Sequence, residues 1–197
     1  MKLAEIATVW SGYLSRGRIQ ASESGSHSLV QARDVNANDL SCDTICLIRF
    51  TPTLSPSDCV LSSGDILFMA RGSRNYAVLL ERIPELSLAA GCFFVVRVTS
   101  SAVLPGYVAW YINQPPIEHY LLQNTGRSVH MPVVQRAVLE NMPIPVPPLE
   151  TQKQIAALDA LCREEQRLLE DLKQKRKILL ATACLRAADE GLEKVTL

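Results

Sequence analysis

The sequence lacks the patterns that most directly mark membrane, secreted and metal-binding proteins. No apolar stretch is long enough to span a bilayer, and the first residues carry neither the basic region nor the apolar run of a secretory signal. The six cysteines include no CxxC pair and have no companion histidines nearby. We therefore expect a cytoplasmic protein with free thiols and no metal site.

Signatures of the common catalytic sites are also missing. The sequence contains no GxSxG, GxxxxGK[ST], HExxH or GxGxxG motif. Its three histidines, His27, His119 and His130, lie far apart in the chain. We therefore expect no catalytic site, although a small hydrolase assembled from dispersed residues is an alternative.

Lysine is scarce in the first three quarters of the chain. Before the proline cluster at residues 143–148, Lys2 is the only lysine, and arginine carries the remaining positive charge. A net charge of zero argues against a nucleic-acid binder that ignores sequence. The planar guanidinium, however, suits paired hydrogen bonds to phosphates and guanine edges, so a sequence-reading protein fits this composition. For any one arginine, a surface ion pair is the alternative.

Strand-length apolar runs come first in the chain, and helical spacing follows. The predicted strands are residues 28–35, 44–50, 66–70, 77–80 and 91–98. After Pro105, apolar residues recur at helical spacing as far as Gln123, with a break at Pro115, and residues 133–140 form a short helical candidate. This order, without βαβ alternation, predicts an α+β domain with a curved, mixed or antiparallel sheet and short helices.

Glycine and proline are absent from residues 151–190, where a coiled-coil pattern runs instead. Positions at alternating steps of three and four form a seam, which comprises Ile155, Leu158, Cys162, Glu165, Leu169, Leu172, Arg176, Leu179 and Ala183. A helix of roughly 35 residues would be about 50 Å long, which is too long for packing against so small a domain alone.

Two charged residues interrupt this seam and indicate how it pairs. If two copies align antiparallel about a point between residues 170 and 171, Glu165 of one copy meets Arg176 of the other. The neighbouring layers then match apolar residues: Leu169 with Leu172, Cys162 with Leu179 and Leu158 with Ala183. Such ionic pairs add little stability but fix register and orientation. We therefore predict an antiparallel homodimer. The alternative is an amphipathic helix that folds onto its own domain or onto a different partner.

The junction between the two regions carries the most specific pattern. Pro143-Ile-Pro-Val-Pro-Pro-Leu149 is followed by Gln152-x-x-Ile155 at the entry to the long helix. Upstream, Ser63-Gly-Asp-Ile-Leu67 precedes an Arg-Gly pair, and residues 107–126 suggest two short helices and a glycine turn. In this order, the motifs resemble the specificity subunits of type I restriction-modification systems.

The resemblance implies a domain organisation and a function. It implies a target recognition domain over residues 1–149, a dimerisation and spacer helix over 150–190 and a tail over 191–197. Family members usually carry two such domains and two such helices, so this sequence resembles a half-subunit. Two copies would then read a bipartite palindromic DNA target, with the helices setting the spacer.

The resemblance also implies partners. They are double-stranded DNA, a methyltransferase (M) subunit and, in systems that cleave, a restriction (R) subunit; S-adenosylmethionine would bind the methyltransferase, so we expect no cofactor here. The competing hypothesis is a non-catalytic structural adaptor that assembles a protein complex through its long helix.

Exposed loops rich in hydrogen-bond donors are the candidate DNA contacts. The first group is Arg71, Ser73, Arg74, Asn75 and Tyr76; the second is Arg127, Ser128 and His130; the third is Tyr13, Arg16 and Arg18. Arginine and asparagine can make paired contacts with guanine and adenine edges. Surface solvation is the alternative for the first group, and a tight turn is the alternative for the second.

Overall fold

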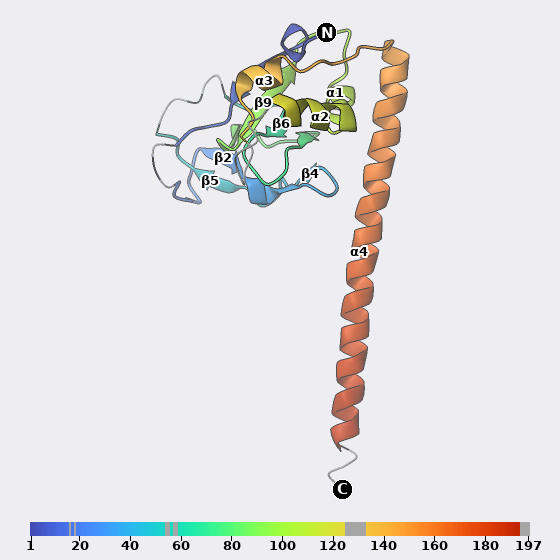
Figure 1. The fold of residues 1–197 in the computed structure, drawn as a ribbon. Coiled ribbons are helices and arrows are strands. Elements are labelled where there is room, and N and C mark those ends of the chain that lie inside the picture. Colours follow the sequence, from blue (N-terminus) through green and yellow to red (C-terminus); the bar gives the residue numbers. More distant parts are fainter. Residues whose placement is uncertain (16, 18, 54–55, 57–58, 125–132, 194–197) are drawn as a thin grey trace. The chain divides into compact units, whose positions relative to one another are not determined.

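A computed structural model of the 197-residue chain describes residues 1–15, 17, 19–53, 56, 59–124 and 133–193, the last five without their side chains (Figure 1). The chain divides into two compact units, Met1–Leu158 and Asp159–Leu197. The boundary lies beyond the predicted end of the recognition domain at residue 149. The first turns of the predicted spacer helix therefore belong to the globular unit.

Strands precede helices along the chain, as predicted. The elements in order are η1 (Leu3–Glu5), β1 (Ala7–Ser11), β2 (His27–Val30), η2 (Ala32–Asp34), β3 (Val35–Asn36), β4 (Ser41–Cys42), β5 (Ile48–Phe50), β6 (Ile66–Met69), β7 (Ala77–Leu79), β8 (Ser87–Ala89), β9 (Phe93–Val98), α1 (Pro105–Ile112), α2 (Pro115–Asn124), α3 (Arg136–Glu140) and α4 (Leu149–Glu193). This arrangement confirms the predicted α+β class.

The described strands form three sheets rather than one curved sheet. The central sheet has the order β1-β9-β6-β7 and is antiparallel throughout. A smaller sheet, β5-β2-β8, is mixed, because β2 pairs antiparallel with β5 and parallel with β8. The third is the pair β3-β4. The predicted strand over residues 28–35 ends at Val30, because the η2 turn follows, in which the Asp34 carboxylate accepts a hydrogen bond from the Gln31 N–H at 2.8 Å.

Strand β6 lies between two hydrophobic cores. Ile66 and Phe68 belong to one core, together with residues of α1 and α2, whereas Leu67 and Met69 belong to the other. Successive side chains of a strand point to opposite faces. A run of four apolar residues is therefore what a strand covered on both faces requires. Figure 1 shows α1 and α2 beside the central sheet.

Proline marks the starts of the two short helices. Pro105 occupies the first turn of α1, and Pro115 begins α2. At these positions the missing N–H is not needed by the helix. The Asn113 side chain at the end of α1 then fastens the helix to β7: its Oδ1 accepts the Ala77 N–H at 2.9 Å, and its Nδ2 donates to the Ala77 carbonyl at 2.8 Å.

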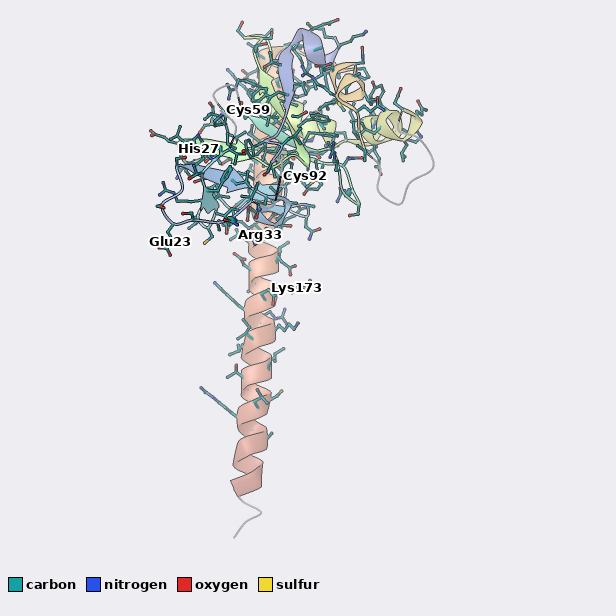
Figure 2. All side chains as sticks on the ribbon, turned by 90° about the vertical axis from the view of Figure 1, so that its left-hand side faces the viewer. Glu23, His27, Arg33, Cys59, Cys92 and Lys173 are labelled. Atoms are coloured by element: carbon teal, nitrogen blue, oxygen red, sulfur yellow. The ribbon has the colours of Figure 1, made fainter. Side chains whose placement is uncertain are left out.

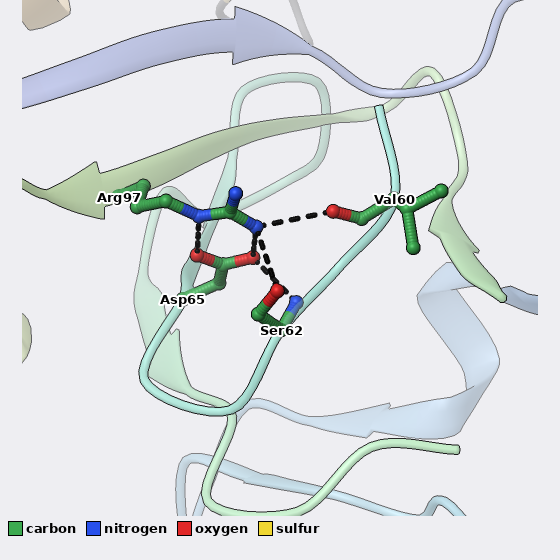
Figure 3. Close-up of polar contacts among 4 residues, drawn as sticks. All are labelled: Val60, Ser62, Asp65 and Arg97. Carbon is green, nitrogen blue, oxygen red and sulfur yellow. Dashed lines mark hydrogen bonds and ion pairs between the residues drawn. The ribbon is translucent and has the colours of Figure 1, made fainter. Parts of the chain in front are cut away.

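A buried ion pair closes the turn that leads into β6 (Figure 3). Asp65 is 1% exposed, and its two oxygens accept hydrogen bonds from Nε and Nη2 of Arg97, both at 2.7 Å. The same carboxylate accepts the Ser62 N–H at 2.8 Å, across a turn in which Gly64 has φ +91°. The hydrogen bonds to Asp65 raise the pKa of Arg97 above its ordinary value, so its guanidinium stays charged. Arg97 therefore has a structural role in this turn.

The long helix α4 runs without a break from Leu149 to Glu193 (Figure 1). It thus continues through Gly191, where the sequence predicted a tail. The proline-rich segment before it is extended and lies beside the N-terminus: the Ile144 N–H donates to the Met1 carbonyl at 2.8 Å, and the Leu3 N–H donates to the Met142 carbonyl at 2.9 Å. Within the described parts of the chain, no helix combines the length and apolar character needed to cross a membrane.

Candidate nucleic-acid interface

A surface groove of about 1060 Å³ lies in the globular unit beside the predicted contact loops. It is lined by the segment after β1, by the end of β2 with the turn that follows, by residues 90–92 between β8 and β9, and by Ile48 of β5 and Arg71. Figure 2 labels two of the lining residues, Arg33 and Cys92. Residues from the first third of the chain and from residues 71 and 90–92 therefore contribute to one concave surface.

Backbone hydrogen bonds to the β8–β9 connection hold the walls of this groove. The Tyr13 N–H donates to the Ala89 carbonyl at 2.7 Å, and on the other side the Arg71 N–H donates to the Cys92 carbonyl at 3.3 Å. Gly12 permits the close approach on the first side, because a Cβ at this position would overlap the Ala90 carbonyl oxygen. The groove is thus positioned by main-chain pairing rather than by mobile side chains.

The charges of the groove favour an anionic ligand. Arg71 is exposed, and the side chain of Arg33 is 66% exposed, with its Nε 3.6 Å from an oxygen of Asp34. An exposed ion pair of this kind contributes little, so it does not prevent Arg33 from binding a phosphate. Among the lining residues that the structure describes, none is aspartate or glutamate. Burial raises the pKa of Cys92, so its thiol adds no negative charge at neutral pH.

The structure divides the first predicted contact group. Arg71 lines the groove, whereas Ser73, Arg74 and Asn75 line a separate hollow of about 170 Å³ beside α1 and α2. The Asn75 Nδ2 donates to the Met69 carbonyl at 2.8 Å, so this side chain closes the turn.

The prediction for Tyr76 is wrong. Its side chain is 6% exposed and belongs to a hydrophobic core, and burial raises the pKa of its hydroxyl. Tyr76 therefore cannot contact DNA from this position.

Of the third predicted group, the structure describes Tyr13, which forms part of the groove wall. Tyr13 is 8% exposed, its hydroxyl oxygen accepts the Thr53 N–H at 3.0 Å, and its ring centroid lies 5.4 Å from that of Phe50. The other residues of the third group and the whole second group lie outside the described residues; they are Arg16, Arg18, Arg127, Ser128 and His130.

Val133, the first described residue after the gap at 125–132, is anchored beside the groove. It forms an antiparallel bridge with Arg71, and the next N–H, that of Val134, donates to the Ala70 carbonyl at 3.0 Å. The described chain therefore resumes after residue 132 next to Arg71, the member of the first group that lines the groove.

The sequence interpretation missed Arg33, Gln31 and Gln20 as groove residues. Arg33 falls within a segment that the apolar pattern predicted as a strand, and no local signal distinguishes it from the other arginines. In the described part of the chain, no group of three or more histidine, cysteine, aspartate or glutamate side chains is arranged to hold a metal ion.

The predicted dimer seam is exposed along most of α4. Among the described side chains, eight of the nine seam positions are exposed, including Leu158, Leu169, Leu172 and Leu179. Ile155 is the exception, because it packs against the core of the globular unit. We therefore exclude Ile155 from the interface. An apolar stripe of this kind typically marks an interaction surface.

The fold and the groove together define an α+β domain with an arginine-bearing surface groove, followed by a long helix. Residues 106–175 match a family model described as a type I restriction modification DNA specificity domain. A solved structure titled as the HsdS subunit from Thermoanaerobacter tengcongensis is 16% identical, with a TM-score of 0.53, over 86% of this chain and 38% of that one. Another, from a study of complex assembly and conformational transition of the type I R-M system, is 20% identical, with a TM-score of 0.63, over 93% of this chain and 47% of that one.

These matches confirm the predicted resemblance. Residues 106–175 match the family's DNA specificity domain, and the chain shares its fold with these two solved structures. It spans less than half the length of either matched structure.

Proposed function

We propose that this chain is the sequence-specific DNA-recognition subunit of a type I restriction-modification complex and has no catalytic site of its own. The groove carries the proposal: its described lining residues include arginines but no aspartate or glutamate. DNA backbones are bound by arginine and by polar side chains on rigid scaffolds. The family match supports it. The chain would assemble with a methyltransferase subunit and, in a cleaving system, with a restriction subunit.

We further propose that two copies pair antiparallel through α4. The exposed seam of α4 supports this proposal, since Glu165 and Arg176 are exposed and become partners in the antiparallel register. A dimer would place two identical recognition domains on one target. Two identical readers related by a twofold axis recognise a palindrome, split by a spacer between the half-sites.

Selection from a pool of random DNA duplexes tests this function. We expect the chain, incubated alone and with its methyltransferase partner, to enrich a split palindrome with one preferred spacer. A homodimer would select two identical half-sites, whereas a chain with two different recognition domains would select two unrelated half-sites. Flat selection in both incubations would contradict DNA recognition and favour the structural adaptor.

Replacing both groove arginines should weaken DNA binding in a salt-dependent way. For Arg33→Ala with Arg71→Ala, we expect the slope of log K against log salt to fall by about 2, since each lost phosphate contact removes about 1. Titrations at several salt concentrations measure this slope. Arg82→Ala is the matched control, because Arg82 is exposed and does not line the groove. Equal slopes for the double variant and the wild type would reject this groove as the DNA interface.

A further inference from the structure

Gln152, in the first turn of α4, is fully buried and makes three side-chain hydrogen bonds. Its Oε1 accepts the Leu104 N–H at 2.9 Å, and its Nε2 donates to the carbonyls of Ala102 at 3.0 Å and Pro147 at 2.7 Å. Both amide hydrogens and the amide oxygen are therefore used. The sequence motif Gln152-x-x-Ile155 thus has a physical role that the DNA-binding groove does not explain.

The side chain of Gln152 connects three pieces of backbone. Leu104 is the residue just before α1, Pro147 belongs to the extended linker, and Gln152 itself belongs to α4. The amide pairs with the carbonyl of residue 102 and the N–H of residue 104, as a neighbouring strand would. Rotating α4 by one residue turns this side chain by about 100° and would break all three bonds.

Further contacts hold the same junction. The Tyr107 hydroxyl donates to the Pro145 carbonyl at 2.8 Å, which fixes the linker. Gly106 of α1 faces Ala156 of α4: a Cβ at Gly106 would lie 3.4 Å from the Cβ of Ala156, which is van der Waals contact. Ile155 packs against the core one turn after Gln152. The first turns of α4 are thus held at one rotation and one height on the recognition domain.

We infer that Gln152 is a positioning residue that sets the spacer length of the DNA target. This inference rests on the proposed function, in which α4 separates two recognition domains. Because α4 continues without a break to Glu193, a change in how its first turns sit on the domain alters where the domain is held in the dimer. The half-site sequence depends on the groove instead, so the two properties separate experimentally.

The test compares Gln152→Met with Gln154→Met. Methionine keeps the length and approximate volume of glutamine but makes none of the three hydrogen bonds, and Gln154 is an exposed glutamine in the same turn. We expect Gln152→Met to speed amide hydrogen exchange over residues 149–158 by about tenfold or more, since lost hydrogen bonds favour local opening. We expect Gln154→Met to leave exchange unchanged.

Duplex selection supplies the second measurement. With Gln152→Met, we expect unchanged half-sites but a broadened distribution of spacers, and with Gln154→Met the wild-type spacer. Tyr107→Phe, which removes only the hydroxyl bonded to Pro145, serves as a milder second variant with the same expected direction if Gln152→Met does not fold. These outcomes would support Gln152 as a positioning residue.

Other outcomes would overturn the inference. A wild-type spacer distribution in Gln152→Met, or in Tyr107→Phe if that variant replaces it, would show that the junction does not set the spacer. Loss of the half-site sequence together with the spacer would show a general structural defect instead. Failure of the wild type to select any split target would refute the proposed function itself, and this result is distinguishable from the first two.

Discussion

Asp65→Ala should destabilise the globular unit by about 2–4 kcal/mol, since removing one partner of a buried ion pair typically costs about 3–5 kcal/mol. We expect a smaller loss than is typical because the Arg97 side chain is 40% exposed and can be hydrated once its partner is gone. The Ser62 N–H also loses its acceptor. Urea unfolding, monitored by circular dichroism, measures the change.

The matched control for this substitution is Glu140→Ala. Glu140 pairs with Arg136 at the same distance of 2.7 Å, but this pair lies at the surface of α3, and its arginine side chain is 55% exposed. We expect a loss of less than about 1 kcal/mol. If both variants unfold at the same urea concentration, burial does not determine the importance of the Asp65–Arg97 pair.

Glu165→Arg should raise the dissociation constant of the proposed α4 dimer by about 100-fold or more. In the antiparallel register, each Glu165 faces Arg176 of the other copy, and this layer occurs twice, so the substitution creates two layers of like charge. Like charges at an interface cost several kcal/mol, and about 1.4 kcal/mol corresponds to a factor of ten. Sedimentation equilibrium measures the dissociation constant.

Adding Arg176→Glu to the first substitution should restore dimerisation, because it rebuilds both ion pairs with their signs exchanged. Glu164→Arg is the control, since it makes the same change of charge at an exposed position that lies off the seam. If the wild type, the single variant and the double variant associate equally, this register is wrong. If Glu164→Arg weakens association as much as Glu165→Arg does, net charge rather than register is responsible.

Several elements follow directly from local patterns in the sequence. The residues of β6, β9 and α1 agree with the predicted segments to within a few positions. Their side chains repeat with the period of a strand or a helix, and Gly64, Pro105 and Pro115 mark where the period changes. The sequence patterns did not predict the shorter strands. Strand β8 has only three residues and exists because it pairs in parallel with β2, far away in the sequence.

The α+β class, the long helix and the resemblance to a specificity subunit follow from the sequence, because helical periodicity and the order of turn residues are local properties of the chain. Which arginines share a groove depends on the tertiary fold. Arg33 and Arg71 line one surface because their segments pair through the backbone with distant strands, whereas Arg97 is held by Asp65. The tertiary fold likewise places Tyr76 in the core and provides the three hydrogen-bond partners of Gln152, since burial depends on contacts between residues that no local pattern connects.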